Sequence, residues 1–185
     1  HLKGGEYEDI QALLDDVTSK KPDLICTYRN LHSNAFRWPY TLGSYLSVLT
    51  QETHIPVLVA PHPKKEGEKW PKGPLKTVMA ITDPLTGDDR LVNYAVNFTP
   101  NDGVLWMGHV EDEALYERTI ELISKIPELD TDVAREKLLA QTLKEPTDYI
   151  ASCREVLQQR ESTVTIEAIV TLGHFLKDYR KHIEE

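Results

Sequence analysis

Residues 21–61 limit what this chain can fold into more than any other part of it. Two short apolar runs, at 23–27 and 55–60, each begin beside a proline; a polar, aromatic loop and an amphipathic segment at 41–53 separate them. Buried strands joined through a helix are typical of a parallel sheet that helices cover on both faces. The stretch therefore predicts an α/β fold.

Composition narrows the class of protein. With 185 residues, of which 40% are hydrophobic, the chain is long enough for one domain with a sizeable core. The net charge of -9 argues against general binding to nucleic acid or to anionic membranes. No apolar run approaches the roughly 20 residues of a membrane helix, and no signal peptide opens the chain, so we expect no membrane insertion. Cys26 and Cys153 stand alone, which favours buried or half-buried free thiols in a reducing cytoplasm.

The remaining elements alternate in the same way. A helix is predicted at 6–20, and a linker rich in proline, glycine and charge at 62–74. The second block predicts strands at 75–82, 103–110 and 162–172, helices at 86–98 and 174–185, and a helical region at 111–159 that Pro127 and Pro146 divide into three. Two helices are expected to bury one face each: Leu42, Tyr45, Leu46 and Leu49 in the first block, and Leu91, Val92, Ala95 and Val96 in the second.

The loop of the first block carries a family resemblance. A strand with the sequence Asp-Leu-Ile leads into the loop, Gly43 and Ser44 begin the helix, and a Pro-Val-Leu-Val strand follows. In these features the chain resembles the universal stress protein family. In that family, the nucleotide loop has two glycines separated by two residues, followed by nine residues and then Gly-Ser. Asn30 and Ser33 stand where those glycines are expected, and His32 stands where some members have histidine.

The second block resembles the start of a domain of the same family. Its first strand ends at Thr82 and Asp83, and its second strand ends at His109 and Val110. The resemblance implies that Asp83 lies by the adenine and the ribose, and that the backbone of Val110 lies by the base. A turn or helix cap before Pro84 is the alternative role for Asp83.

The resemblance implies a regulatory or sensor module that binds an adenine nucleotide, ATP with Mg²⁺ on its phosphates, and that has at most slow ATP hydrolysis. A strand end and a helix N-terminus offer N–H groups to phosphates. The expected nucleotide-binding residues are Thr27, Asn30, His32, Ser33, Gly43, Ser44, Thr82, Asp83 and Val110. Arg29 and Arg37 of the loop can also bind phosphate.

The order of the elements resembles a window cut across two tandem domains. Residues 1–61 match a C-terminal half, 62–74 a linker, and 75–185 an N-terminal half. The family strand order is 3-2-1-4-5. We therefore expect an open, parallel, five-stranded sheet in circularly permuted order, either within one compact domain or by exchange of halves between two chains, with a homodimer as the expected assembly. The nucleotide is expected at the point where the strand order reverses.

Two other functions remain open. The missing loop glycines, the loop aromatics Phe36 and Trp38 and the long helical region favour a degenerate domain that has lost nucleotide binding. Such a domain can dimerise or dock, for example as the soluble regulatory part of a larger protein such as a transporter. An enzyme such as a nucleotidyl transferase is the third alternative, with His32 and His109 as acid–base groups. For the two loop aromatics, packing is the simpler interpretation.

Overall fold

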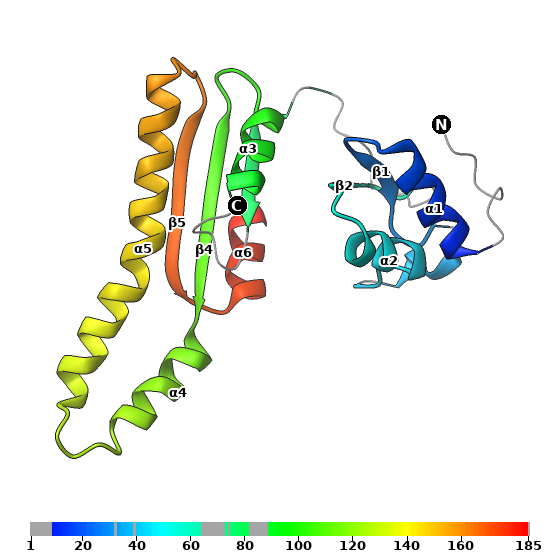
Figure 1. Ribbon diagram of the computed structural model, residues 1–185. Helices are drawn as coiled ribbons and strands as arrows, with labels where there is room; N and C mark the ends of the chain where they lie inside the picture. Colours follow the sequence, from blue (N-terminus) through cyan, green and yellow to red (C-terminus); the bar gives the residue numbers. More distant parts are fainter. Residues whose placement is uncertain are drawn as a thin grey trace. The chain divides into compact units, whose positions relative to one another are not determined.

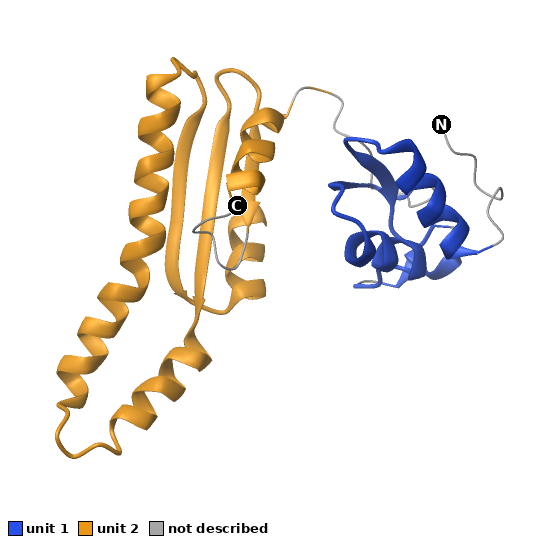
Figure 2. Ribbon diagram, viewed as in Figure 1, with its two compact units in different colours: residues 1–72 blue, residues 73–185 orange. Residues whose placement is uncertain are grey.

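The chain divides into two compact units, residues 1–72 and 73–185 (Figure 2). The computed structural model describes residues 9–31, 33–38, 40–63, 73, 75–81 and 89–184. The boundary between the units falls inside the linker predicted at 62–74. Both units are α/β, and every strand pair in them is parallel, as the sequence predicts.

Unit 1 is a small parallel sheet with helices packed on it (Figure 1). Its elements are α1 (Ile10–Lys20), β1 (Ile25–Tyr28), a 3₁₀ helix η1 (Asn34–Arg37), α2 (Ser44–Glu52) and β2 (Val57–Ala60). Leu13 and Val17 of α1 pack with Leu49 of α2 in one apolar cluster, against Ile25 and Val57 at the start of the two strands. The two helices therefore share one face of the sheet.

Two expectations for unit 1 are wrong. Leu42 is 50% exposed, because α2 begins only at Ser44, after Gly43, and Leu42 lies outside the helix face that it was expected to join. Cys26 is exposed rather than buried. It alternates along β1 with Ile25, which packs on the helices, so the Cys26 side chain points to the opposite face of the sheet.

Unit 2 has three parallel strands in the order β3-β4-β5 (Figure 1). Its elements are β3 (Thr77–Ile81), α3 (Asp89–Phe98), β4 (Val104–Asp112), α4 (Glu113–Ile123), α5 (Thr131–Gln159), β5 (Thr165–Gly173) and α6 (Phe175–Glu184). β4 pairs with β5 along its whole length, whereas the last partner of β3 is Gly108. β4 therefore continues for four residues past the described end of β3.

Helices cover both faces of the sheet in unit 2. Successive side chains of a strand point to opposite faces. Leu105 and Met107 of β4 are 0% exposed and belong to a core that also contains residues of α3 and α5. Gly108 lies on the other face, where a Cβ would be 2.5 Å from the ring of Tyr179 in α6. The α3 and α5 helices thus share one face, and α6 lies on the other.

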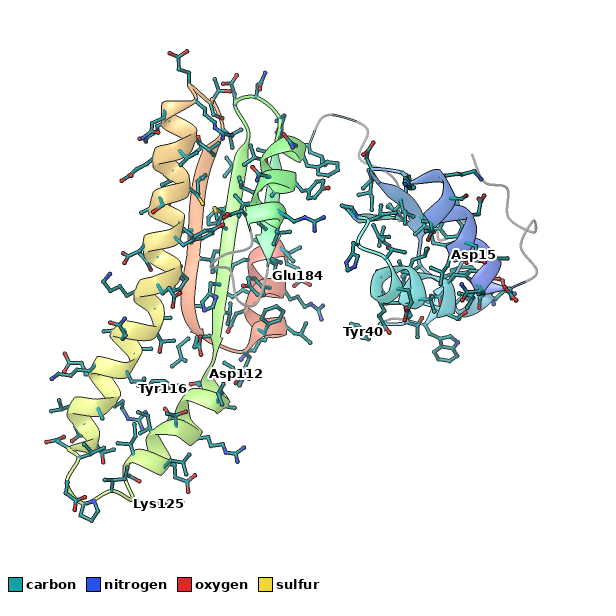
Figure 3. All side chains as sticks on the ribbon, in the orientation of Figure 1. Asp15, Tyr40, Asp112, Tyr116, Lys125 and Glu184 are labelled. Carbon is teal, nitrogen blue, oxygen red and sulfur yellow. The ribbon has the colours of Figure 1, made fainter. Side chains whose placement is uncertain are left out.

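The helical region between β4 and β5 forms a hairpin that extends past the ends of these strands (Figure 1). The Tyr116 side chain lies between α4 and α5 (Figure 3), and its hydroxyl donates to the carbonyl oxygen of Arg135 at 2.7 Å. Pro127 separates the two helices, as predicted. Pro146 does not divide a helix: it lies buried inside α5, although it lacks the backbone N–H that a helix interior uses.

The strands form two sheets, so the single five-stranded sheet is wrong for the described residues of one chain. Each observed pair joins strands that follow one another along the chain through a helical crossover. A five-stranded sheet also requires β3 to pair with β1, and these strands lie on opposite sides of the linker. In these strand labels, the family order 3-2-1-4-5 corresponds to β5-β4-β3-β1-β2. Within each sheet, the observed neighbours are those that this order requires. No helix of the described residues is long and apolar enough to cross a membrane.

Candidate functional site

The loop after β1 is built around Asn30. Its φ of 56° lies in the left-handed region, which asparagine adopts more readily than most residues. The residue is 1% exposed, and its N–H donates to the carbonyl of Leu42 at 2.7 Å. Its side-chain amide donates to the carbonyl of Thr41 at 3.1 Å and to the Thr41 hydroxyl at 3.0 Å. Asn30 therefore supplies the left-handed turn expected of a glycine and also ties the two ends of the loop together.

Gly43 is required where it stands. Its φ is 86°, and a Cβ there would lie 2.8 Å from the Cα of Asn30. Gly43 is the N-cap of α2 and has no side chain with which to cap it. The first backbone bond at this end runs from the N–H of Ser47 to the carbonyl of Gly43 at 3.0 Å. The N–H groups of the first turn thus have no carbonyl partner within the helix, which is the arrangement that favours anions.

Ser33 and Arg29 have structural roles in this loop. Ser33 is the N-cap of η1, with an extended backbone, and its hydroxyl accepts from the N–H of Ala35. It therefore does not reproduce the second glycine of the expected pattern. The Arg29 guanidinium donates to the carbonyls of Phe36 and Trp38, at 3.1 and 3.2 Å. These donors hold the loop, so they are not directed at a phosphate.

An aromatic stack fastens the loop to the end of β2. The Phe36 ring lies parallel to the His62 ring, with centroids 3.9 Å apart and an interplanar angle of 12°. Tyr28 meets His62 edge-on at 4.8 Å. Phe36 is 7% exposed and His62 is 4% exposed, so the packing role expected of Phe36 is confirmed. Trp38 is 69% exposed, and packing is the wrong interpretation for that residue.

In unit 2, the expected base-binding strand end is the part of β4 that extends past β3. Val110 is 4% exposed, and it pairs with Thr171 of β5. His109 is 6% exposed; its Nε2 lies 3.3 Å from Oε2 of Glu111, and its Nδ1 has no hydrogen-bond partner among the described residues. The backbone edge of this segment that faces away from β5 has no strand partner among the described residues.

The structure thus brings together four of the predicted residues in one loop of unit 1. These are Asn30, Ser33, Gly43 and Ser44. Thr27 lies in β1 shortly before the loop, paired with Val59. Val110 belongs to unit 2, and His32, Thr82 and Asp83 lie outside the described residues.

Sequence reasoning missed two residues that shape the loop. Thr41 accepts from the Asn30 side chain, and His62 anchors Phe36. A histidine two residues after an apolar run, at the carboxyl edge of a predicted sheet, was the available signal for His62. Thr41 carries no comparable signal. No protein-family model matches the chain, and searches of curated proteins and of solved structures found no match either.

Proposed function

We propose that unit 1 binds a phosphate group of an adenine nucleotide at the N-terminus of α2. The observation that carries the proposal is Gly43, which begins the helix without a side-chain cap and has no Cβ to obstruct the first-turn N–H groups. The dipole of α2 and these donors both favour negative charge. Asn30 holds the loop that leads to this end, so the donors are positioned before a ligand arrives.

For unit 2, taken by itself, the family resemblance gives a separate proposal. Asp83 is proposed to bind the adenosine part of a nucleotide, and the backbone of Val110 to face the base. The edge of β4 next to Val110 supports this role, because its polar groups on that side have no strand partner among the described residues. Mg²⁺ is proposed to arrive with the phosphates of ATP, and the nucleotide is proposed to regulate the protein rather than to be turned over rapidly.

A homodimer is the proposed assembly. Among the described residues, β3 and β1 each have one strand neighbour, so each leaves one edge to which a partner strand can pair. Pairing β3 of one copy with β1 of a second copy gives the strand order of the universal stress protein family. The proposed setting is the cytoplasm, since both cysteines are free and Cys26 is exposed.

Calorimetric titration of the full chain with ATP, AMP and adenosine tests the phosphate site. Ser44→Asp places a carboxylate in the first turn of α2, where it favours the helix dipole by about 0.3–1 kcal/mol and repels a phosphate. We expect Ser44→Asp to weaken ATP binding by at least about tenfold without lowering the melting temperature. Ser47→Ala, one turn further on, is the matched control and should bind as the wild type does. An unchanged ATP affinity in Ser44→Asp would show that the phosphate does not bind at the start of α2.

A docking surface is the second candidate function, and one observation favours it. Trp38, Tyr40 and Leu42 are 69%, 90% and 50% exposed, all in one loop (Tyr40 is labelled in Figure 3). Exposed aromatics gathered on one surface are typical of interaction sites. If this loop joins two copies, Trp38→Ser with Tyr40→Ser should convert a dimer to a monomer in sedimentation, and millimolar ATP should not bind. An unchanged sedimentation coefficient counts against docking.

A further inference from the structure

A groove in unit 2 lies between α3 and α5, on the face of the sheet that these helices share. Its volume is about 340 Å³. Val92 and Val96 line it from α3, and Val156 and Leu157 line it from α5. It lies within one unit, apart from the loop of unit 1 proposed above to bind phosphate. Mostly apolar grooves of this size with a few polar groups are typical of small-molecule sites.

A hydrogen bond fixes how the two helices are aligned along the groove. The Tyr149 hydroxyl donates to Oδ1 of Asp89 at 2.9 Å, which joins the first residue of α3 to the middle of α5. Both helices are crossovers of a parallel sheet, so they run in the same direction. Val96, seven residues after Asp89 on α3, and Val156, seven residues after Tyr149 on α5, both line the groove. Arg160 ends the groove, about 16 Å beyond Tyr149 at the rise of an α-helix.

The two ends of the groove carry opposite charge. Asp89 provides a carboxylate at one end, and Arg160 provides a guanidinium at the other. No carboxylate of the described residues forms an ion pair with Arg160. Val156, between these ends, is 45% exposed, so the groove is open to a ligand along α5. This polarity suits a molecule with an apolar body and one anionic group, with the anion at Arg160.

The middle of the groove is uncharged. Burial, together with the hydrogen bond to Asp89, raises the pKa of Tyr149, so its phenol stays protonated and continues to donate. Burial also raises the pKa of the Cys153 thiol, which lines the same groove. A neutral thiol is a poor nucleophile and packs as an apolar group. The uncharged middle of the groove therefore suits the apolar body of a ligand.

We propose that the α3–α5 groove binds a small amphipathic organic anion, whose apolar body lies along Val96 and Val156 and whose anionic group pairs with Arg160. Charge complementarity selects this ligand class over a neutral apolar molecule. The Asp89 end repels a second negative charge and accepts a hydrogen-bond donor. The site differs from the proposed nucleotide site in both its location and its chemistry.

The probe for the experiment is 8-anilinonaphthalene-1-sulfonate, with the neutral N-phenyl-1-naphthylamine as its uncharged counterpart. The readout is the alkylation rate of each cysteine in the full chain, measured by mass spectrometry. Cys153 lines the groove, and the exposed Cys26 of unit 1 is an internal control. At a sulfonate concentration four times its dissociation constant, alkylation of Cys153 should slow about fivefold by mass action, and that of Cys26 should not change.

Three variants make the test specific. Arg160→Gln should weaken binding of the sulfonate by about tenfold, as expected for the loss of one hydrogen bond to a charged group, and should leave binding of the neutral probe unchanged. Val156→Trp fills the groove from an exposed position and should abolish protection of Cys153 by either probe. Leu122→Trp, at a position on α4 that is 58% exposed and outside the groove, should change nothing. Equal protection of both cysteines, no protection of Cys153, or full protection in Val156→Trp would overturn the proposal.

Discussion

Gly43 lies so close to Asn30 that a Cβ at position 43 would be 2.8 Å from the Asn30 Cα. This close approach joins the two ends of the loop, which the hydrogen bonds of Asn30 to Thr41 and Leu42 also hold together. Both residues have positive φ, at 86° and 56°. The loop after β1 is therefore set by two backbone conformations that β-branched and bulky side chains rarely adopt.

Gly43→Ala should destabilise unit 1, because the new Cβ meets backbone atoms and the φ of 86° is strained for alanine. The expected cost is about 1–3 kcal/mol in the free energy of unfolding. Urea denaturation measures this loss of stability, and hydrogen exchange in each unit shows that it arises in unit 1. Gly73→Ala is the matched control, since a Cβ at Gly73 meets nothing within 4 Å. Equal stability of the two variants contradicts the account of this loop.

The Phe36–His62 stack should contribute strongly to the stability of unit 1. Phe36→Ala removes a ring that is 7% exposed, and such substitutions cost about 3–5 kcal/mol. Trp38→Ala, two residues on, removes a ring that is 69% exposed and should change stability by less than about 0.5 kcal/mol. Thermal unfolding of both variants, read from the amides of β2, compares them. A larger loss in Trp38→Ala shows that the stack is not the anchor.

Tyr149 should make unit 2 sensitive to alkali. Its pKa is raised above the ordinary value of 10.0, chiefly by burial and then by the bond to Asp89. A group whose folded pKa is raised contributes stability that is complete below its unfolded pKa and is lost as the pH rises through the folded pKa. The melting temperature of the wild type should therefore fall above pH 10, the ordinary pKa of tyrosine.

Tyr149→Phe removes the titrating hydroxyl and should show a smaller alkaline loss of melting temperature than the wild type. The loss that remains includes the Cys153 thiol, whose pKa burial also raises. Tyr94→Phe on α3, which replaces a ring that is 37% exposed, is the control. If the wild type and Tyr149→Phe lose melting temperature identically as the pH rises, the Tyr149 phenol does not cause the alkaline loss of stability.

Gly108 should govern how α6 packs on the sheet. A Cβ at position 108 would lie 2.5 Å from Cε1 of Tyr179. Because Tyr179 is only 3% exposed, its ring has to shift within a packed environment. Overpacking of this kind costs about 1–3 kcal/mol. Gly108→Ala should speed hydrogen exchange in α6 more than in α5. Adding Tyr179→Leu should recover part of the loss, because the two substitutions share one contact; purely additive effects argue against that contact.

Much of the fold was predictable because hydrophobic periodicity is a local property. Most predicted strands and helices of both blocks have counterparts among the described residues, although the helical region predicted as three pieces forms two helices, α4 and α5. Val92 and Ala95 are buried as their spacing predicts. The prediction at Pro146 failed because proline disfavours a helix interior without excluding it, and Pro146 lies buried inside α5. The prediction for Leu42 failed because α2 begins only at Ser44, after the N-cap Gly43, so that Leu42 lies outside the helix.

The sites were less predictable, since they depend on contacts between distant residues. The tolerance of asparagine for left-handed backbone is visible in the sequence at Asn30, but its bonds to Thr41 are not. The stack of Phe36 on His62 joins residues on either side of α2 and β2. The α3–α5 groove requires Tyr149 to reach Asp89, 60 positions away. No spacing rule predicts such pairs before the elements are placed.

Calorimetric titration of ATP into the wild-type chain and into Ser44→Asp tests the central claim most directly. We predict binding of ATP and AMP by the wild type, weaker binding of adenosine, and a loss of at least about tenfold for ATP in Ser44→Asp at an unchanged or higher melting temperature. Equal affinities of ATP and adenosine, or an unchanged affinity for ATP in Ser44→Asp, would contradict a phosphate site at the start of α2.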